Sequence, residues 1–365
     1  MASKVYFTDL HTENGESLLK KLYRLLDRAG LGTIDFRNKF VAIKLHFGEP
    51  GNMAYIRPNY AKVVADYVKE RGGIPFLTDC NTLYVGRRKH AVEHIEAAYE
   101  NGYNPFVTGC QVLIADGLRG TDDVDVEING EYVKAAHIGR AIADADVLIS
   151  MNHFKGHCEA GFGGAIKNLG MGCGSRAGKM DMHSHGKPYV EQERCVGCKR
   201  CIRNCGQNAI AYTETHKAFI DPERCVGCGR CIGLCNEDAI IPLCDEILDN
   251  LNCKMAEYSL AACKNKEHFH ISFAMDISPE CDCFGTNDVP VVPDIGIFAS
   301  FDPVAIDAAC VDAVNASPTC ACGMLKDLGE GDRFVGIHPE TNGSVQLIHG
   351  EKIGLGSMAY ERITV

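Results

Sequence analysis

The sequence has no apolar run that could cross a membrane, since none of its stretches approaches the roughly 18 apolar residues that a spanning helix needs. Its first residues contain no basic segment followed by an apolar one, so we see no secretory signal. An excess of basic residues is also missing: 37 Lys and Arg stand against 48 Asp and Glu, a formal net charge of −11. Nucleic-acid phosphates are bound by clustered Lys and Arg, so we expect no nucleic-acid partner. These absences favour a cytoplasmic protein that does not associate with membranes.

The composition is that of a globular protein with ample apolar material for a core. Hydrophobic residues make up 46% of the 365 residues and charged residues 23%, and the length suggests about two domains. Cysteine is frequent, with 20 residues. In a reducing compartment we expect those outside metal sites to be free thiols.

Eight of the cysteines form two copies of one spacing. In each copy three cysteines are three residues apart, and a fourth follows four residues later. The first copy consists of Cys195, Cys198, Cys201 and Cys205, and the second of Cys225, Cys228, Cys231 and Cys235. The neighbouring residues repeat as well, because Glu-Arg precedes and Val-Gly follows the first cysteine of each copy. Three closely spaced thiolates can bind one face of an iron–sulfur cube, while the fourth is carried away on a short helical turn.

This segment resembles the bacterial two-cluster ferredoxin family over residues 186–242. The resemblance implies that the fourth cysteine of each copy binds the other cluster. One 4Fe-4S cluster would then be held by Cys195, Cys198, Cys201 and Cys235, and the other by Cys225, Cys228, Cys231 and Cys205. The proline that the family usually has after the fourth cysteine is replaced by Gly206 and Asn236, which form a less rigid turn. The alternatives are structural zinc, which usually takes two separated ligand pairs, and disulfides, which need an oxidising compartment.

The rest of the chain alternates between strand and helix patterns. Short apolar runs predict buried strands, and stretches with helical spacing lie between them. Examples are the strands at 41–47, 74–78 and 146–151 and the helices at 57–71 and 89–100. Such alternation is typical of βαβ units, so we expect an α/β fold with a mostly parallel sheet and helices on both faces.

The α/β pattern resumes after the cysteine repeats. We therefore expect one α/β domain in two parts, residues 1–186 and 243–365, with a small α+β two-cluster ferredoxin-like insert at residues 187–242. Three local expectations accompany this division. They are a hairpin over 121–133 that turns at Asn129-Gly130, a helix over 135–143, and short strands in the tail 343–365.

Outside the repeats, residues suited to chemistry follow several predicted strands. Because the carboxyl ends of parallel strands form the ligand crevice of open α/β sheets, we expect these residues to lie close together. The candidates for proton transfer or substrate polarisation are His46, His153, His157 and Lys155. Cys281 and Cys283 would point the same way on an extended strand, and together with His46 they could bind a further metal. The ordinary alternatives are hydrogen-bonded core histidines and buried thiols.

A glycine-rich run precedes a predicted helix. Gly161, Gly163 and Gly164 would let backbone N–H groups approach a bound anion at the helix N-terminus, and Lys167 would add positive charge. The run matches neither the dinucleotide fingerprint nor the P-loop pattern. The alternative is that the glycines make room for tight turns.

Nearly the whole chain also resembles the domain-of-unknown-function family numbered 362, which often carries an inserted two-cluster ferredoxin. The likeness rests on the histidine- and glycine-rich stretch 152–174, on Cys281-Asp282-Cys283, and on Pro293-Asp294-Ile295-Gly296 followed by Asp302-Pro303. The resemblance implies an iron–sulfur redox protein but supplies no substrate.

Three functions fit these features, and electron transfer through two 4Fe-4S clusters is common to the first two. The first is a simple electron carrier with a partner-binding domain. The second is a ferredoxin-dependent oxidoreductase that reduces a small-molecule substrate in the crevice, with a catalytic thiol from Cys80, Cys158 or Cys283. The third is a metal or cluster carrier that serves a maturation pathway. We favour electron transfer, which requires a redox partner protein, with a reduction as its extension. An additional metal or a flavin would discriminate between these functions, and the sequence does not determine the oligomeric state.

Overall fold

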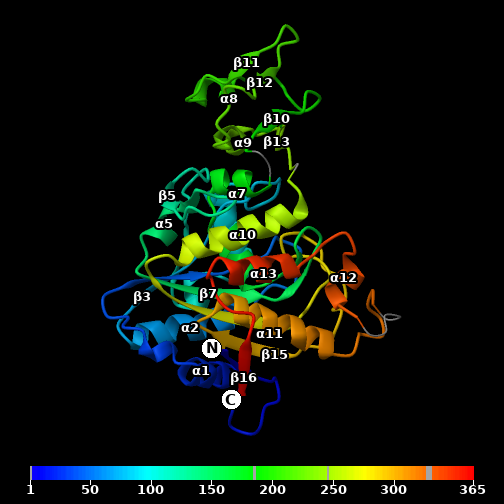
Figure 1. The fold of residues 1–365 in the computed structure, drawn as a ribbon. Coiled ribbons are helices and arrows are strands. Elements are labelled where there is room, and N and C mark those ends of the chain that lie inside the picture. Colours follow the sequence, from blue (N-terminus) through cyan, green and yellow to red (C-terminus); the bar gives the residue numbers. More distant parts are fainter. Residues whose placement is uncertain (1, 184–185, 245, 326–330) are drawn as a thin grey trace.

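The centre of the molecule is an eight-stranded sheet in the order β16-β1-β15-β14-β7-β2-β3-β4 (Figure 1). The computed structural model describes residues 2–183, 186–244, 246–325 and 331–365. The strands are β1 (Ser3–Thr8), β2 (Phe40–Lys44), β3 (Ile74–Asp79), β4 (Gln111–Ile114), β7 (Val147–His153), β14 (Glu267–Ala274), β15 (Gly296–Ser300) and β16 (Tyr360–Thr364). Among these described strands β15 alone runs antiparallel to its neighbours. The expected mostly parallel sheet is therefore confirmed.

Helices cover both faces of this sheet. Val41 and Ile43 of β2 pack into the core under one face, while Ala42 between them faces the core on the other side. The first face is covered by α1 (Leu18–Arg28), α2 (Pro58–Glu70) and α3 (Ala91–Glu100), and the second by α6 (Ala165–Cys173), α10 (Leu248–Cys263) and α11 (Pro303–Ala316). No helix in the described part of the chain is both long and apolar enough to cross a membrane.

The connections contain shorter elements. The helical ones are η1 (Leu31–Thr33), α4 (Pro105–Thr108), α5 (Arg140–Ala143), α7 (Arg176–His183), α12 (Arg333–Ile337) and α13 (Ser344–Lys352). Two antiparallel hairpins accompany them: β5 (Asp123–Glu127) with β6 (Ala135–Gly139), and β8 (Lys155–His157) with β9 (Gly161–Gly163).

Two of the local predictions need correction. The hairpin does turn through Asn129, but its second strand is residues 135–139, which we had predicted as the start of a helix. Ala136 and Ile138 alternate into the core, so burial on one face of a strand overrides the helix propensity of alanine. In the tail, the predicted strands at 344–352 are the helix α13, which packs against α10, and only β16 is a strand.

Residues 187–242, which we call the cysteine module, project from one end of the α/β domain (Figure 1). The module contains β10 (Pro188–Val190), α8 (Arg200–Asn204), β11 (Ile210–Tyr212), β12 (Ala218–Ile220), α9 (Arg230–Leu234) and β13 (Ile240–Pro242). Its first strand pairs with its last, so the chain enters and leaves at adjacent points. The module has a small apolar core, and Leu83 and Met180 of the α/β domain pack into it.

The two halves of the module repeat the same backbone conformation. Gly197 and Gly227 occupy the same place in the two cysteine repeats and have φ angles of +68° and +72°. Two residues later, Lys199 and Gly229 both have a φ angle of 63°. The duplicated sequence therefore folds into duplicated local structure.

Candidate functional site

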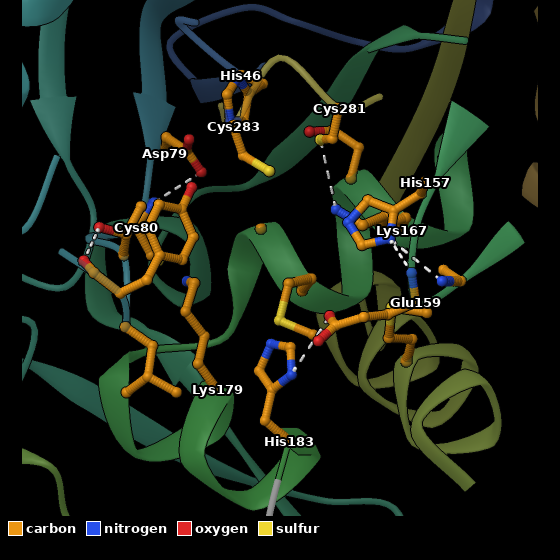
Figure 2. Close-up of a pocket in the computed structure, with 18 of the residues that line it drawn as sticks. His46, Asp79, Cys80, His157, Glu159, Lys167, Lys179, His183, Cys281 and Cys283 are labelled. Carbon is orange, nitrogen blue, oxygen red and sulfur yellow. Dashed lines mark hydrogen bonds and ion pairs between the residues drawn. The ribbon is translucent and has the colours of Figure 1, made fainter. Parts of the chain in front are cut away.

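A cavity of about 290 Å³ lies at the carboxyl ends of β2, β3 and β7 (Figure 2). Lys44, Asp79 and His153, the last residues of these strands, line it. Other walls come from the segment after β3, from α6, α7 and α10, from the loop around Cys281, and from Pro242 at the end of the cysteine module. Parallel α/β sheets place ligands at this edge, and the structure brings the predicted residues of both halves of the domain together there.

Asp282 lies buried behind one wall of the cavity, between Cys281 and Cys283, which line it. Its buried carboxylate lies 3.0 Å from Lys155 Nζ and 3.3 Å from His153 Nδ1, and its second oxygen is 3.5 Å from His46 Nδ1. Burial opposes ionisation, but Lys155 and the two histidines hold the pKa of Asp282 well below its usual range. Although burial also opposes the charge of Lys155, Asp282 raises the pKa of that lysine. Our sequence reasoning did not propose Asp282 as a site residue, although its position between two candidate cysteines could have indicated it.

His46 and His153 use both ring nitrogens for contacts within the protein. His46 Nδ1 accepts the Gly48 N–H at 3.0 Å, and its Nε2 is 2.7 Å from Arg88 Nη1. Burial and the charge of Arg88 lower the pKa of His46. His153 Nε2 lies 3.0 Å from the Met275 carbonyl oxygen. These contacts favour the ordinary alternative, in which both histidines orient the wall of the cavity.

A second group of buried charges also lies at the cavity, although we had not proposed its members as site residues. Lys44 Nζ is 3.0 Å from Asp79 Oδ1 and 2.6 Å from Asn168 Oδ1. Burial would raise the pKa of Asp79, but Lys44 and neighbouring positive charges lower it to about 2. Arg88, also buried, pairs with Glu49 at 2.8 Å. Because Arg88 stands in a basic run, a sequence gives no sign that it is buried.

Cys281 and Cys283 lie on a turn and not on the extended strand that we predicted. The Phe284 N–H donates to the Cys281 carbonyl at 3.0 Å, which closes a four-residue turn. The two sulfur atoms and a His157 ring nitrogen all lie within 4.8 Å of one another, so these residues could hold a metal ion. His46, the expected third ligand, instead contacts Asp282 and Arg88, and His157 takes its place. The structure thus places His157, and not His46, beside the two cysteines.

The thiols of the cavity differ in their surroundings. A hydrogen bond from Cys283 lowers the pKa of Cys281 well below its usual value, against the effect of burial, and Lys167 and Lys155 lower it further. The same hydrogen bond and burial raise the pKa of Cys283. Burial also raises the pKa of Cys80, and it raises that of Cys158 to about 11. Of these four thiols only Cys281, which we had not proposed as a catalytic thiol, lies where a thiolate is stabilised.

The glycine-rich run forms strand β9 and leads into helix α6. At the N-terminus of α6, the Ala165 and Ile166 N–H groups donate to the two carboxylate oxygens of Asp307, at 2.6 and 2.9 Å. A Cβ at Gly164 would overlap this carboxylate. An internal side chain therefore occupies the place where we expected a bound anion, and the glycine makes room for it. Lys167, one turn further along, does reach the cavity.

Two further cavities, both in the cysteine module, are lined by the repeated cysteines. One is bordered by Cys195, Cys198, Cys201 and Cys235, and the other by Cys205, Cys225, Cys228 and Cys231, with Cys201 again at its edge. Backbone N–H groups donate to several of the sulfur atoms. These are the bonds from Ala209 to Cys205 at 3.3 Å, from Ala218 to Cys195 at 3.4 Å and from Ala239 to Cys235 at 3.3 Å. Each cavity thus combines three cysteines of one repeat with the fourth of the other.

The module lies against the wall of the main cavity. Leu83 lines that cavity and also packs in the apolar core of the module. Lys89 Nζ donates to the Cys235 carbonyl at 2.7 Å, and Arg119 donates to the Gly233 carbonyl at 3.1 Å. These contacts join residues near the cysteine repeats to the carboxyl edge of the sheet.

Comparisons with known proteins give a family and distant relatives. Over 161 residues the chain is 28% identical to the "Thylakoid-associated protein sll1697" of Synechocystis, an alignment that covers 43% of this chain and 46% of that protein. The chain thus matches about half the length of this relative. The apoprotein of lactate racemase from Thermoanaerobacterium thermosaccharolyticum superposes with a TM-score of 0.36 and 12% identity, covering 75% of this chain and 51% of that one. A Thermotoga maritima protein gives 0.41 and 10%, covering 81% and 56%. The "Domain of unknown function (DUF362)" family matches residues 41–312, so the chain belongs to this family.

Proposed function

We propose that this protein transfers electrons through two 4Fe-4S clusters held by the cysteine module, and delivers them to a reductive site in the cavity of the α/β domain. One observation carries the proposal. The eight repeated cysteines divide into two sets of four, each set lines its own cavity, and each combines both repeats. This arrangement is the one that two-cluster ferredoxins use.

The residues present fit such clusters. Four thiolates per cavity are the full ligand set of a 4Fe-4S cluster, which carries one electron at a time. The amide hydrogen bonds to the sulfur atoms of Cys195, Cys205 and Cys235 would stabilise the added negative charge of reduction. Zinc is less suited, because each set takes three evenly spaced cysteines and a distant fourth.

The main cavity supports the reductive extension of the proposal. Its volume of about 290 Å³ suits a small molecule, and its wall shares Leu83 with the core of the module. Lys155 and His46 line the cavity, and Lys155 is paired there with the buried Asp282. A redox partner protein would deliver the electrons at the exposed end of the module.

Metal analysis tests the proposal directly. Protein purified without oxygen should contain about eight iron atoms and about eight acid-labile sulfides per chain, and reduction should produce the electron paramagnetic resonance signal of reduced 4Fe-4S clusters. Cys198→Ser should lower the iron content, whereas Cys322→Ser, which changes an exposed cysteine outside the repeats, should leave it unchanged. Zinc in place of iron would refute the proposal.

The close group of His157, Cys281 and Cys283 favours a second candidate, a metal or cluster carrier. A carrier would bind iron or another metal beyond the two clusters and would release it to a partner protein. Iron well above eight atoms per chain, or a second metal that a chelator removes while the clusters stay, would support this function. A flavin, detected by absorbance after denaturation, would instead support the reductase.

A further inference from the structure

The turn at Cys281–Phe284 places two cysteines where they can form a bond with each other. A turn brings its first and third residues closer together than an extended strand does, toward the Cα separation of about 4.4–6.8 Å that disulfides require. The sulfur atoms of Cys281 and Cys283 lie within 4.8 Å of each other. Rotation of the two side chains would be the movement that joins them.

The surroundings of Cys281 suit a nucleophilic thiolate. Lys167 Nζ lies 3.8 Å from its sulfur, and a His157 ring nitrogen and the Cys283 sulfur lie within 4.8 Å of it (Figure 2). An ammonium group, an imidazole and a second thiol thus surround this sulfur, and the Asp282 carboxylate lies 3.8 Å from it. Neighbouring positive charges and hydrogen-bond donors are what activate cysteines for attack on sulfur.

The protonation of His157 favours this thiol chemistry over a metal ion at the same place. Its Nδ1 accepts the N–H groups of Glu159 and Ala160, both at 3.1 Å. A neutral ring that accepts at Nδ1 carries its proton on Nε2, so the nitrogen near Cys281 is a donor and has no lone pair for a metal. Metal-binding histidines have the opposite arrangement, in which the far nitrogen donates to an oxygen. The ammonium group of Lys167 would also repel a cation beside Cys281.

We propose that Cys281 and Cys283 are a redox-active pair that reduces a low-molecular-weight disulfide in the main cavity. The Cys281 thiolate attacks one sulfur of the substrate, the substrate S–S bond breaks, and one thiolate leaves while Cys281 forms a mixed disulfide. The Cys283 sulfur then gives up its proton and attacks Cys281, which releases the second thiolate and forms the Cys281–Cys283 disulfide. With one proton from Cys283 and one from solvent, the products are two thiols. The substrate has gained two electrons and the pair has lost two.

The pair returns to its reduced state by taking up two electrons and one proton. That these electrons arrive through the cysteine module rests on the function proposed above, whereas the exchange with a disulfide does not. Cys281 is 1% exposed, so the substrate must be small enough to enter the cavity, and a folded protein disulfide would not reach it.

The test uses the full chain, reduced with dithiothreitol, desalted without oxygen and then treated with 2-hydroxyethyl disulfide. Mass spectrometry of the alkylated peptides should show the Cys281–Cys283 disulfide in the wild-type protein. Cys283→Ser should stop at a stable mixed disulfide on Cys281, and Cys281→Ser should form neither product at this site. Lys167→Gln should slow the first step by roughly tenfold, because it removes a charged donor from the thiolate.

The chain contains its own control. Cys320 and Cys322 have the same spacing but lie in more exposed positions. At neutral pH Cys281 should react at least tenfold faster than Cys322. Burial alone would disfavour the Cys281 thiolate, but the positive charge and hydrogen-bond donors beside Cys281 stabilise it. An equal or slower rate, or a tightly bound metal that only Cys281→Ser releases, would overturn the proposal. The iron content separates the two proposals. If the protein contains no iron but the cysteine pair still reacts, the proposed clusters are refuted and the proposed disulfide exchange is not.

Discussion

Replacing Asp282 by asparagine should destabilise the protein strongly. The carboxylate is fully buried and lies 3.0 Å from Lys155 Nζ and 3.3 Å from His153 Nδ1. Asparagine has nearly the same shape, so the change removes the negative charge without creating a cavity. Lys155, whose side chain is 8% exposed, would then be a buried cation without its counter-charge.

The expected loss follows from the cost of breaking a buried ion pair, about 3–5 kcal/mol in the free energy of unfolding. The double variant Asp282→Asn with Lys155→Met should lose less than Asp282→Asn alone, because it removes the uncompensated charge as well. Asp276→Asn is the matched control. Its pair with Arg57, at 3.3 Å, has side chains that are 37% and 56% exposed, so its loss should cost about 0–1 kcal/mol.

Urea unfolding followed by circular dichroism measures these differences. The pKa of Asp282 is lowered in the folded state, so its contribution should be complete at neutral pH and should disappear only as the pH falls through that lowered pKa. If Asp282→Asn lowers the free energy of unfolding by less than about 1 kcal/mol, the ion pair between Asp282 and Lys155 does not stabilise this part of the structure as we expect. A double variant that loses the sum of both single effects would refute the coupling.

Three further predictions concern other parts of the molecule. Gly227→Ala should lower the iron content, because Gly227 has a positive φ and a Cβ there would overlap the Gly186 carbonyl. Gly206→Ala should leave the iron content unchanged, because a Cβ at Gly206 would have no described atom within 4 Å. Burial raises the pKa of Asp116 from 3.8 to about 6. The free energy of unfolding should therefore fall by on the order of 3 kcal/mol as the pH rises from about 4 to about 6. Urea unfolding measures this fall, and the Asp116→Asn variant should not show it. Lys89→Met should speed hydrogen exchange in the second half of the cysteine module without changing the iron content; unaltered exchange would contradict the contact with Cys235.

Periodic patterns predicted the sheet and its helices because they are read over short distances. The alternation of Val41, Ala42 and Ile43 between two cores is a local property of a strand with both faces buried. The same reasoning failed at residues 135–139, where an alanine-rich segment pairs with β5. Its partner is the preceding strand of the same hairpin, and helix propensity takes no account of strand pairing.

The candidate site shows the same limit at the level of side chains. The rule that ligands bind at the carboxyl ends of parallel strands led us to expect His46, His153, Lys155 and His157 at one edge, and all four line the cavity. It could not show that His157, and not His46, lies beside the two cysteines. It also missed the buried charges Arg88 and Asp307, because a charged residue is exposed in most proteins and its burial depends on partners far along the chain.

The sequence by itself determined the alternation of strands and helices and the spacing of the eight repeated cysteines, since both are set by residues close together in the chain. Only the tertiary structure decided which cysteines share a cavity, that Asp282 joins Lys155 to two histidines, and that Cys281 meets Lys167. The physical reason is that burial, charge pairing and hydrogen bonding arise between segments that folding brings together, and these interactions give each side chain its chemistry.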